Sequence, residues 1–384
     1  MLPKPTMTLL NWRVLQLTPR ILRQFCFPRS KQILRAMSAT ATENILYCET
    51  GDKGVITINR PKALNAINLE MVRKIYCNLK DWENEKSLVI IKGMGEKSFC
   101  AGGDVRKIVE DGPTEESKSF FREEYQLNYL IGCYKIPYVA LLDGITMGGG
   151  VGLSVHGRYR VATERTLFAM PETAIGLFPD VGGSYFLPRL EGKLGLYLGL
   201  TGFRLKGADT LKAGIATHYC ESSKLGELET ALLNCKDKDT VSATLDKYCQ
   251  RPSGEFVLKQ HMDKINKYFS ASSVEEIFTK LAGDGSEWAG KTLKDLCKMS
   301  PTSLKVTFQE IECGAKQSLA ECLKMEYRIV VHHLLDSDFK EGVRAVLIDK
   351  DQNPKWNPAK LEDVSKERVQ FYFAKLPDNE ELKL

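Results

Sequence analysis

The sequence predicts an α/β protein whose C-terminal portion is helical. Short apolar runs typical of buried strands alternate with amphipathic stretches typical of helices, which favours a sheet with crossover connections. Several of these runs lead into glycine clusters. After about residue 222 the chain becomes helix-prone, more charged and poor in Gly and Pro. We therefore expect a β-rich core and then a helical portion.

The composition is that of a globular enzyme. The 384 residues are 43% hydrophobic and 27% charged, and the formal net charge is +5. This charge is small for the length, and no basic stripe with interleaved aromatic residues predicts nucleic-acid binding. No apolar run reaches the roughly 18 residues of a membrane span. The 11 cysteines and 5 histidines show no metal-ligand spacing, so we expect reduced thiols and no metal site.

Residues 1–42 differ from the rest of the chain. They contain seven basic residues, and the first acid is Glu43. An Arg-rich, acid-free leader is typical of a mitochondrial transit peptide, so we expect a protein of the mitochondrial matrix. The alternative is a disordered basic tail without a targeting role. The predicted division is this leader at 1–42, the core at 43–220 and the helical portion at 221–384.

The first part of the core alternates strand and helix patterns. The runs 45–48 and 55–58 flank a Gly-containing turn and predict a β-hairpin. Asn68 is a typical helix N-cap, and the apolar residues after it recur every three or four positions as far as Trp82. The next predicted elements are a buried strand at 88–91, a helix at 115–132 and a buried strand at 138–142.

The second part of the core continues this alternation. Residues 158–163 and 167–169 complete the predicted strand series. Helical patterns follow at 194–200 and 208–213, and Gly214 ends the second of them.

Two glycine-rich segments follow predicted strands, at 98–104 (SFCAGGD) and 143–152 (DGITMGGGVG). Glycine lets backbone N–H groups approach a ligand closely, and a helix N-terminus adds partial positive charge. Two converging N–H groups would form an oxyanion hole for a carbonyl oxygen. Each segment alone could equally be a turn or a close packing contact. Neither matches the dinucleotide, Walker or serine-hydrolase motifs.

Two carboxylates, Glu172 and Asp180, lie in the apolar, Gly/Pro-punctuated segment 170–183. Carboxylates are rare in such surroundings unless they are paired, hydrogen-bonded or chemically used. Two acids near one pocket can divide a hydrolytic reaction, one activating water and the other orienting it. The structural alternatives are a cap or an arginine partner for Glu172, and an N-cap role for Asp180 near Gly182.

Taken in order, the motifs make the chain resemble the crotonase (enoyl-CoA hydratase/isomerase) superfamily. The resemblance covers roughly residues 45–220 and implies a crotonase-like spiral of ββα units. It also implies an acyl-CoA substrate and no cofactor apart from the CoA of that substrate. The motifs that carry it are Asn59–Ala66, Phe99–Asp104, Gly148–Gly150, Pro171-Glu172 and Gly182-Gly183.

The resemblance implies a role for several further residues. The thioester oxygen would lie between the N–H groups of Gly103 and Gly149. Asp104 is expected to be a structural cap, and Cys100 a buried thiol between apolar neighbours. His156 precedes Gly157 and is expected to end a helix and not to act as a base. The CoA moiety would lie near Arg60, Lys62, Ala63 and Ala101, although Arg60 could equally be a surface charge.

One position departs from the hydratases of this superfamily. They carry a catalytic glutamate two residues after the Gly triplet, whereas this chain has Gly152 there. Their second glutamate matches Glu172, and the position eight residues further on, usually glycine, is Asp180 here. The pair of glutamates that adds water across a double bond is therefore missing.

The altered pattern resembles the branch that hydrolyses 3-hydroxyisobutyryl-CoA in valine breakdown and also accepts 3-hydroxypropionyl-CoA. The segments 144–152 and 170–183 and the helical C-terminal portion match that branch. The resemblance implies that Glu172 attacks the thioester carbonyl or activates water, while Asp180 orients the water or the 3-hydroxyl group. The substrate-contacting glutamate of the branch falls on Glu124, which could otherwise be a solvated helix acid.

Two other function classes stay open. One is a hydratase or isomerase that acts on another acyl-CoA. The other is a non-catalytic RNA-binding or scaffold member of the same fold, which the lack of a basic face disfavours. Because crotonases often form trimers, a homo-oligomer is compatible with the resemblance, although the altered C-terminal portion could block that contact.

Overall fold

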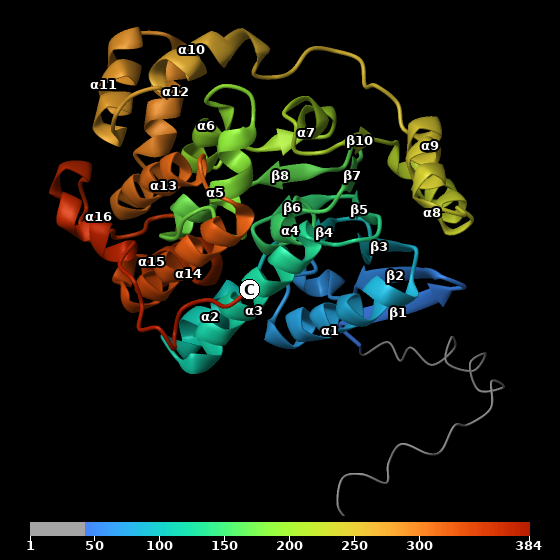
Figure 1. Cartoon of the computed structure of the whole chain (residues 1–384). Coiled ribbons are helices and arrows are strands. Elements are labelled where there is room, and N and C mark those ends of the chain that lie inside the picture. Colours follow the sequence, from blue (N-terminus) through green and yellow to red (C-terminus); the bar gives the residue numbers. More distant parts are fainter. Residues whose placement is uncertain (1–42) are drawn as a thin grey trace, which may run out of the picture. The chain divides into compact units, whose positions relative to one another are not determined.

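Two sheets form the core of residues 43–384, the part of the chain that this computed structural model describes (Figure 1). The predicted transit peptide lies outside the described residues. The larger sheet has the strand order β1-β2-β3-β5-β7-β10, and the smaller has the order β4-β6-β8-β9. The strands are β1 (Ile45–Thr50), β2 (Lys53–Ile58), β3 (Leu88–Gly93), β4 (Ser98–Cys100), β5 (Tyr138–Leu142), β6 (Ile145–Met147), β7 (Tyr159–Ala162), β8 (Leu167–Ala169), β9 (Leu205–Lys206) and β10 (His218–Tyr219).

Successive strands alternate between the two sheets. The first strand of each pair, β3, β5 or β7, joins the larger sheet, and the second, β4, β6 or β8, joins the smaller. Neighbouring strands are parallel except in the pairs β1–β2 and β8–β9. This repeated placement, with helices between the pairs, confirms the predicted spiral of ββα units.

The predicted buried strands β3 and β5 are neighbours in the middle of the larger sheet. Both faces of this sheet are covered. Val89 and Ile91 pack in one apolar cluster, whereas Leu88 and Ile90 pack in another. Burial on both faces explains why these strands are continuously apolar and do not alternate with polar residues.

The predicted helices of the core are confirmed. The helix α1 begins after Asn68, whose side chain accepts a hydrogen bond from the N–H of Met71. The helix α3 begins after Thr114, which caps Ser117 in the same way, and it crosses the functional site described below. The core helices are α1 (Leu69–Glu85), α2 (Val105–Asp111), α3 (Glu115–Gly132), α4 (Gly149–Gly152), α5 (Gly183–Phe186), α6 (Leu194–Thr201) and α7 (Ala208–Lys212).

The chain after β10 is helical, as predicted. In Figure 1, α8 and α9 lie at the right beside β10, and α10 to α16 gather at the left. The helix α14 packs against α3 and α5, so the C-terminal portion reaches the core directly. Its helices are α8 (Leu225–Leu233), α9 (Lys238–Tyr248), α10 (Met262–Tyr268), α11 (Val274–Asp284), α12 (Glu287–Leu296), α13 (Pro301–Gly314), α14 (Leu319–Leu335), α15 (Ser337–Val343) and α16 (Lys366–Tyr372).

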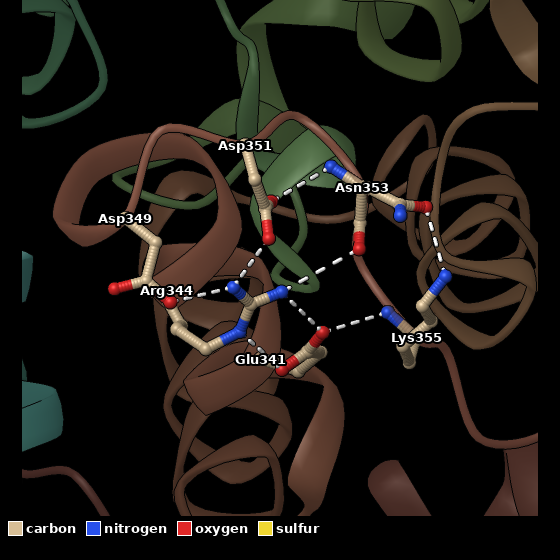
Figure 2. Close-up of polar contacts among 6 residues, drawn as sticks. All are labelled: Glu341, Arg344, Asp349, Asp351, Asn353 and Lys355. Atoms are coloured by element: carbon tan, nitrogen blue, oxygen red, sulfur yellow. Dashed lines mark hydrogen bonds and ion pairs between the residues drawn. The ribbon is translucent and has the colours of Figure 1, made fainter.

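A hydrogen bond to the core and an ion-pair cluster stabilise the last part of the chain. The backbone carbonyl of Lys383 accepts a hydrogen bond of 2.9 Å from the Gln126 side chain on α3, and Figure 1 shows the C-terminus over this helix. Arg344, after α15, is surrounded by carboxylates (Figure 2). Its guanidinium lies 2.7 Å from both Asp349 and Asp351 and 2.9 Å from Glu341. This cluster fixes the loop that leads to α16.

No helix within residues 43–384 combines the length and the apolar character needed to cross a bilayer. In the same part of the chain, no group of three His, Cys, Asp or Glu side chains is arranged to hold a metal ion.

Candidate active site

The two glycine-rich segments meet at one point. The segment after β4 carries Gly103, and the segment after β6 begins α4 at Gly149. A Cβ atom added to Gly149 would lie only 3.2 Å from the backbone nitrogen of Gly103. Within residues 43–384, neither N–H group is engaged in the turn and loop hydrogen bonds that surround it. The two N–H groups are therefore free to bind a carbonyl oxygen between them.

Three carboxyl groups are buried beside these glycines. Glu172 begins a short 3-10 helix, η4 (Glu172–Ile175), Asp180 lies in the turn that follows, and Glu124 comes from α3. Their exposed fractions are 5%, 5% and 2%. The Tyr125 hydroxyl donates a hydrogen bond of 2.8 Å to Asp180. Oε2 of Glu172 and Oε1 of Glu124 are buried without a partner among the described residues.

Glycine is required where the two sides of the site meet. A Cβ atom on Gly148 would lie 2.9 Å from Oε1 of Glu172, and one on Gly149 would lie 2.5 Å from Oε1 of Glu124. Gly148 also has a φ angle of 46°, which disfavours other residues. The structure thus brings Gly103, Gly149, Glu124, Glu172 and Asp180 together, as the sequence predicts.

Burial raises the pKa of all three acids. It raises the pKa of Asp180 to about 7, although the hydrogen bond from Tyr125 opposes the shift. Burial and the charge of Asp180 hold the pKa of Glu172 well above 4.5. The pKa of Glu124 is also held well above 4.5, by burial and by the charges of Asp180 and Glu172. Asp180 is the only one of the three whose pKa is lowered by a side-chain hydrogen bond, so we expect it to ionise first.

The structural alternatives for these acids do not hold. Glu124 is buried and is not a solvated helix acid. Glu172 makes no side-chain cap hydrogen bond, and no basic side chain contributes to its pKa. Gly182, and not Asp180, precedes α5 as its N-cap. Among the described residues, the Tyr125 hydroxyl is the side-chain partner of Asp180, whereas one oxygen each of Glu172 and Glu124 stays without a partner.

A residue that the sequence analysis missed holds the segment after Asp180. The carboxylate of Glu326, on α14, accepts hydrogen bonds of 2.7 Å from the N–H of Gly182 and 3.0 Å from the N–H of Ser184. It also accepts one from the Ser184 hydroxyl. Because Glu326 lies 144 positions after Gly182 along the chain, no local motif could have indicated this contact.

Val181 and His156 fix the same turn from another direction. Val181 has a φ of 53°, an unfavourable conformation for a β-branched residue. Nε2 of His156 lies 2.7 Å from the carbonyl oxygen of Val181 and forms a hydrogen bond with it. Burial lowers the pKa of His156 to about 4, so the ring is neutral at physiological pH and donates this hydrogen bond. No local pattern in the sequence predicts that His156 holds the turn at Val181.

A further buried acid, Glu310 on α13, was also missed. It is fully buried, and neither carboxyl oxygen has a partner among the described residues. Burial and the charge of Glu326 are the largest causes that hold its pKa well above 4.5. The charges of Asp180 and Glu172 also raise its pKa, so Glu310 lies close enough to interact with the acids of the site.

The position of the missing hydratase acid is filled. A Cβ atom on Gly152 would lie 2.7 Å from Nδ2 of Asn128 and 2.7 Å from Cβ of Val181. No longer side chain fits there without displacing one of these neighbours. The departure at Gly152 is thus built into the packing around the site.

The residues expected near CoA lie at one edge of the site. Arg60 donates to Asp104 at 3.1 Å and to the carbonyl of Ala66 at 2.7 Å, so two of its nitrogens hold the protein itself. Lys62 is exposed, whereas Ala63 and Ala101 are half-buried. These contacts do not test the expected CoA contacts, which stay predictions.

Two expectations about neighbouring residues have clear outcomes. Asp104 precedes α2 but makes no side-chain cap hydrogen bond, so the expected cap is wrong, and its carboxylate pairs with Arg60 instead. Cys100 is fully buried, and burial raises the pKa of its thiol to about 12. The thiol is therefore not ionised at physiological pH and is not a nucleophile, as expected.

Comparisons with known proteins found a matching family model and similar relatives. A family model described as enoyl-CoA hydratase/isomerase matches residues 53–373. The chain is 57% identical to the mitochondrial 3-hydroxyisobutyryl-CoA hydrolase of Xenopus tropicalis, over 92% of this chain and 94% of that protein. It is 53% identical to the Homo sapiens protein of the same name, over 93% and 96% of the two chains.

Two solved structures share the fold. The carnitinyl-CoA dehydratase of Mycobacterium thermoresistibile has a TM-score of 0.83 and 38% identity, over 89% of this chain and 98% of that one. An enoyl-CoA hydratase of Rhodobacter sphaeroides has a TM-score of 0.80 and 34% identity, over 89% and 100%. Both matches extend through most of the C-terminal portion.

Proposed function

The chain belongs to the enoyl-CoA hydratase/isomerase family, and on that premise we propose that it hydrolyses the thioester of 3-hydroxyisobutyryl-CoA to the free hydroxy acid and CoA. Its similarity to hydrolases of that name supports the substrate. One observation carries the choice of reaction. The buried Glu172 lies beside Gly148, the charge of Asp180 acts on Glu172, and Gly152 leaves no room for a second hydratase acid.

The glycine side of the site stabilises the charge that develops on the substrate. The thioester oxygen binds between the N–H groups of Gly103 and Gly149. Attack on the carbonyl carbon places negative charge on this oxygen, and the two donors stabilise it. Losing one such donor costs roughly 3–4 kcal/mol of transition-state stabilisation in comparable sites.

Glu172 is the reacting group on the acid side. Its unpartnered Oε2 is free to attack the thioester carbon or to accept a proton from water. Either role requires the ionised carboxylate, although burial favours the protonated form. Asp180, with a pKa of about 7, is the neighbouring carboxylate that accepts this proton, in a transfer that the raised pKa of Glu172 opposes.

Asp180 and Glu124 orient the substrate and the water. Asp180 is held by Tyr125 on one oxygen, so its direction is fixed. It orients the attacking water or the 3-hydroxyl group, and Glu124 contacts this hydroxyl from the other side. A pocket of this kind also accepts 3-hydroxypropionyl-CoA, because the missing methyl group is worth only about 1–3 kcal/mol.

Two routes to the acid use the same residues. In the covalent route, an oxygen of Glu172 bonds to the acyl carbon, the C–S bond breaks, and water opens the resulting anhydride. In the other route, Glu172 takes a proton from the water that attacks. A single turnover in heavy-oxygen water tests the covalent route. Label in the Glu172 side chain supports it, whereas label only in the product means that water attacked the acyl carbon, either of the thioester or of the anhydride.

An assay over a small acyl-CoA panel tests the proposed reaction. We expect the purified protein to release free thiol from 3-hydroxyisobutyryl-CoA, and less efficiently from 3-hydroxypropionyl-CoA. We expect no rapid hydration of crotonyl-CoA. Fast hydration with the hydroxyacyl thioester left intact would overturn the proposal. Salt-dependent RNA binding without thioesterase activity would instead favour the binding-protein class.

The mitochondrial matrix is the proposed location. The names of the relatives and the Arg-rich leader support a mitochondrial protein. Fractionation of mitochondria, with N-terminal sequencing of the mature protein, tests it. Recovery of the uncleaved chain outside the organelle would contradict it. A homo-oligomer is also a prediction, and the oligomeric state can be measured on the same purified protein.

A further inference from the structure

One stripe of the helix α3 follows the whole length of the site. Phe120, Glu124, Asn128 and Gly132 are spaced four residues apart, so they lie on one face of the helix, one above another. The residues opposite them are, in the same order, Gly103, Gly149, Gly152 and His156.

The contacts along this stripe are close. A Cβ atom on Gly103 would lie 2.9 Å from the Phe120 ring, and one on Gly152 would lie 2.7 Å from the Asn128 amide. The stripe therefore begins at the oxyanion glycines, continues through the buried residues Glu124 and Asn128, and ends at the exposed Gly132. The Glu124 carboxyl lies at the level of the thioester, and Asn128 lies one turn deeper.

Asn128 has the properties of a ligand-binding residue. Its side chain is fully buried, and both Nδ2 and Oδ1 lack a partner among the described residues. Buried polar groups in folded proteins are almost always hydrogen-bonded, and the exceptions often belong to functional sites. An amide offers one donor group and one acceptor, which is the complement of a hydroxyl group.

The spacing fits the position of a hydroxyl group on the acyl chain. Four residues of helix advance by roughly 6 Å, which separates Asn128 from the level of the thioester. A 3-hydroxyl oxygen lies roughly 4 Å from the thioester carbon, and a hydrogen bond adds about 3 Å. A hydroxyl at this position of the acyl chain is therefore within reach of the Asn128 amide.

We propose that Asn128 is a specificity-determining residue that binds the 3-hydroxyl group of the acyl chain. The hydroxyl accepts a hydrogen bond from Nδ2 and keeps its one proton for the contact with Asp180 or Glu124. This inference rests on the proposed thioesterase function. It assigns part of the preference for hydroxyacyl substrates to the Asn128 amide, which lies where a side chain at position 152 would begin.

The test compares two substrates that differ only in the hydroxyl group. For 3-hydroxyisobutyryl-CoA, Asn128→Leu should lower kcat/KM by about 100-fold, because the hydroxyl loses its partner in a buried site. For isobutyryl-CoA, the same variant should change kcat/KM by less than about threefold. Both values come from the thiol-release assay on the full chain.

A matched control variant is Thr210→Val. The Thr210 hydroxyl on α7 is also fully buried and unpartnered among the described residues, but it lies outside the site. Thr210→Val should leave the ratio of kcat/KM for 3-hydroxyisobutyryl-CoA to kcat/KM for isobutyryl-CoA unchanged. If Asn128→Leu does not fold, Asn128→Ser removes the amide with a smaller change in polarity and should shift the ratio in the same direction.

The outcomes separate this inference from the function on which it rests. A wild-type protein that releases no thiol from 3-hydroxyisobutyryl-CoA overturns both. An active wild type whose Asn128 variants lose both substrates equally overturns only the inference, because Asn128 would then position water or the fold. Variants without any effect also overturn it.

Discussion

The glycine side and the acid side of the site are built in different ways. The glycine side consists of Gly103 and Gly149, which consecutive ββα units bring together through neighbouring strands of the smaller sheet. The acid side consists of η4 and the turn around Asp180, and it depends on Glu326 from the C-terminal helices. In the proposed mechanism, the spiral supplies the groups that bind the thioester carbonyl, and Glu326 from the C-terminal portion holds the turn next to Asp180.

The two sides also differ in their energetics. The glycine side exposes only backbone donors, whereas the acid side buries carboxyl groups that favour the protonated form. The pKa of Asp180 is about 7 when folded and 3.8 for a free carboxyl group. Its stabilising contribution is therefore complete below pH 3.8 and is lost as the pH rises through about 7. Above about pH 7 the ionised, buried Asp180 therefore reduces the stability of the folded protein.

The largest expected effect comes from removing the reacting group on the acid side. Glu172→Gln should lower kcat for thiol release by about 1000-fold or more, because the amide neither attacks nor accepts a proton. It should leave the Kd for the substrate within a few fold, since the glycine side is intact. Isothermal titration and steady-state assays measure both. If Glu172→Gln lost substrate binding as well as kcat, the acid side would also be needed for binding, and the division between the two sides would be wrong.

The next effect tests whether the C-terminal helices complete the acid side. Glu326→Ala removes the acceptor for Gly182 and Ser184 and should lower kcat by about 10–100-fold, with a smaller change in KM. Glu341→Ala is the matched control, because this carboxylate also accepts several hydrogen bonds but lies in the Arg344 cluster of Figure 2. Equal effects of the two variants would contradict the assigned role.

A third variant tests the boundary between the two sides. Gly152→Ala should reduce the free energy of unfolding by about 1–3 kcal/mol, because the new methyl group overlaps Asn128 and Val181. Gly226→Ala is the control, since nothing lies within 4 Å of the added atom. Urea denaturation measures both. In addition, Gly152→Glu should not create crotonyl-CoA hydration, and rapid hydration by this variant would refute the packing argument.

The smallest effect is a shift in pH dependence. Tyr125→Phe removes the hydrogen bond that stabilises the Asp180 carboxylate, so the pKa of Asp180 should rise above about 7. In the proposed mechanism, Asp180 must be ionised to accept a proton. The acid limb of the kcat/KM profile should therefore move to higher pH, with little loss at the alkaline end. The control is Tyr138→Phe, because the Tyr138 hydroxyl is also buried and donates to the Leu153 carbonyl. A shift to lower pH would contradict the assigned hydrogen bond.

The difference between the two sides also explains what the sequence could predict. The glycine motifs, the acids Glu172 and Asp180, and the strands β3 and β5 follow from local patterns of residues. Glu326 and Glu310 lie within long helices where an acid usually faces solvent, and only tertiary packing buries them. The pairing of Asp104 with Arg60 was missed for the same reason, since the partners lie 44 positions apart.

The most direct test of the account is a crystal structure of Glu172→Gln with 3-hydroxyisobutyryl-CoA bound. The account predicts that the thioester oxygen lies within about 3 Å of the backbone nitrogens of Gly103 and Gly149. It also predicts that the side chain at position 172 contacts the thioester carbon, with Asp180 beside it. A thioester oxygen bound away from these two nitrogens, or a carbon out of reach of position 172, would contradict the account.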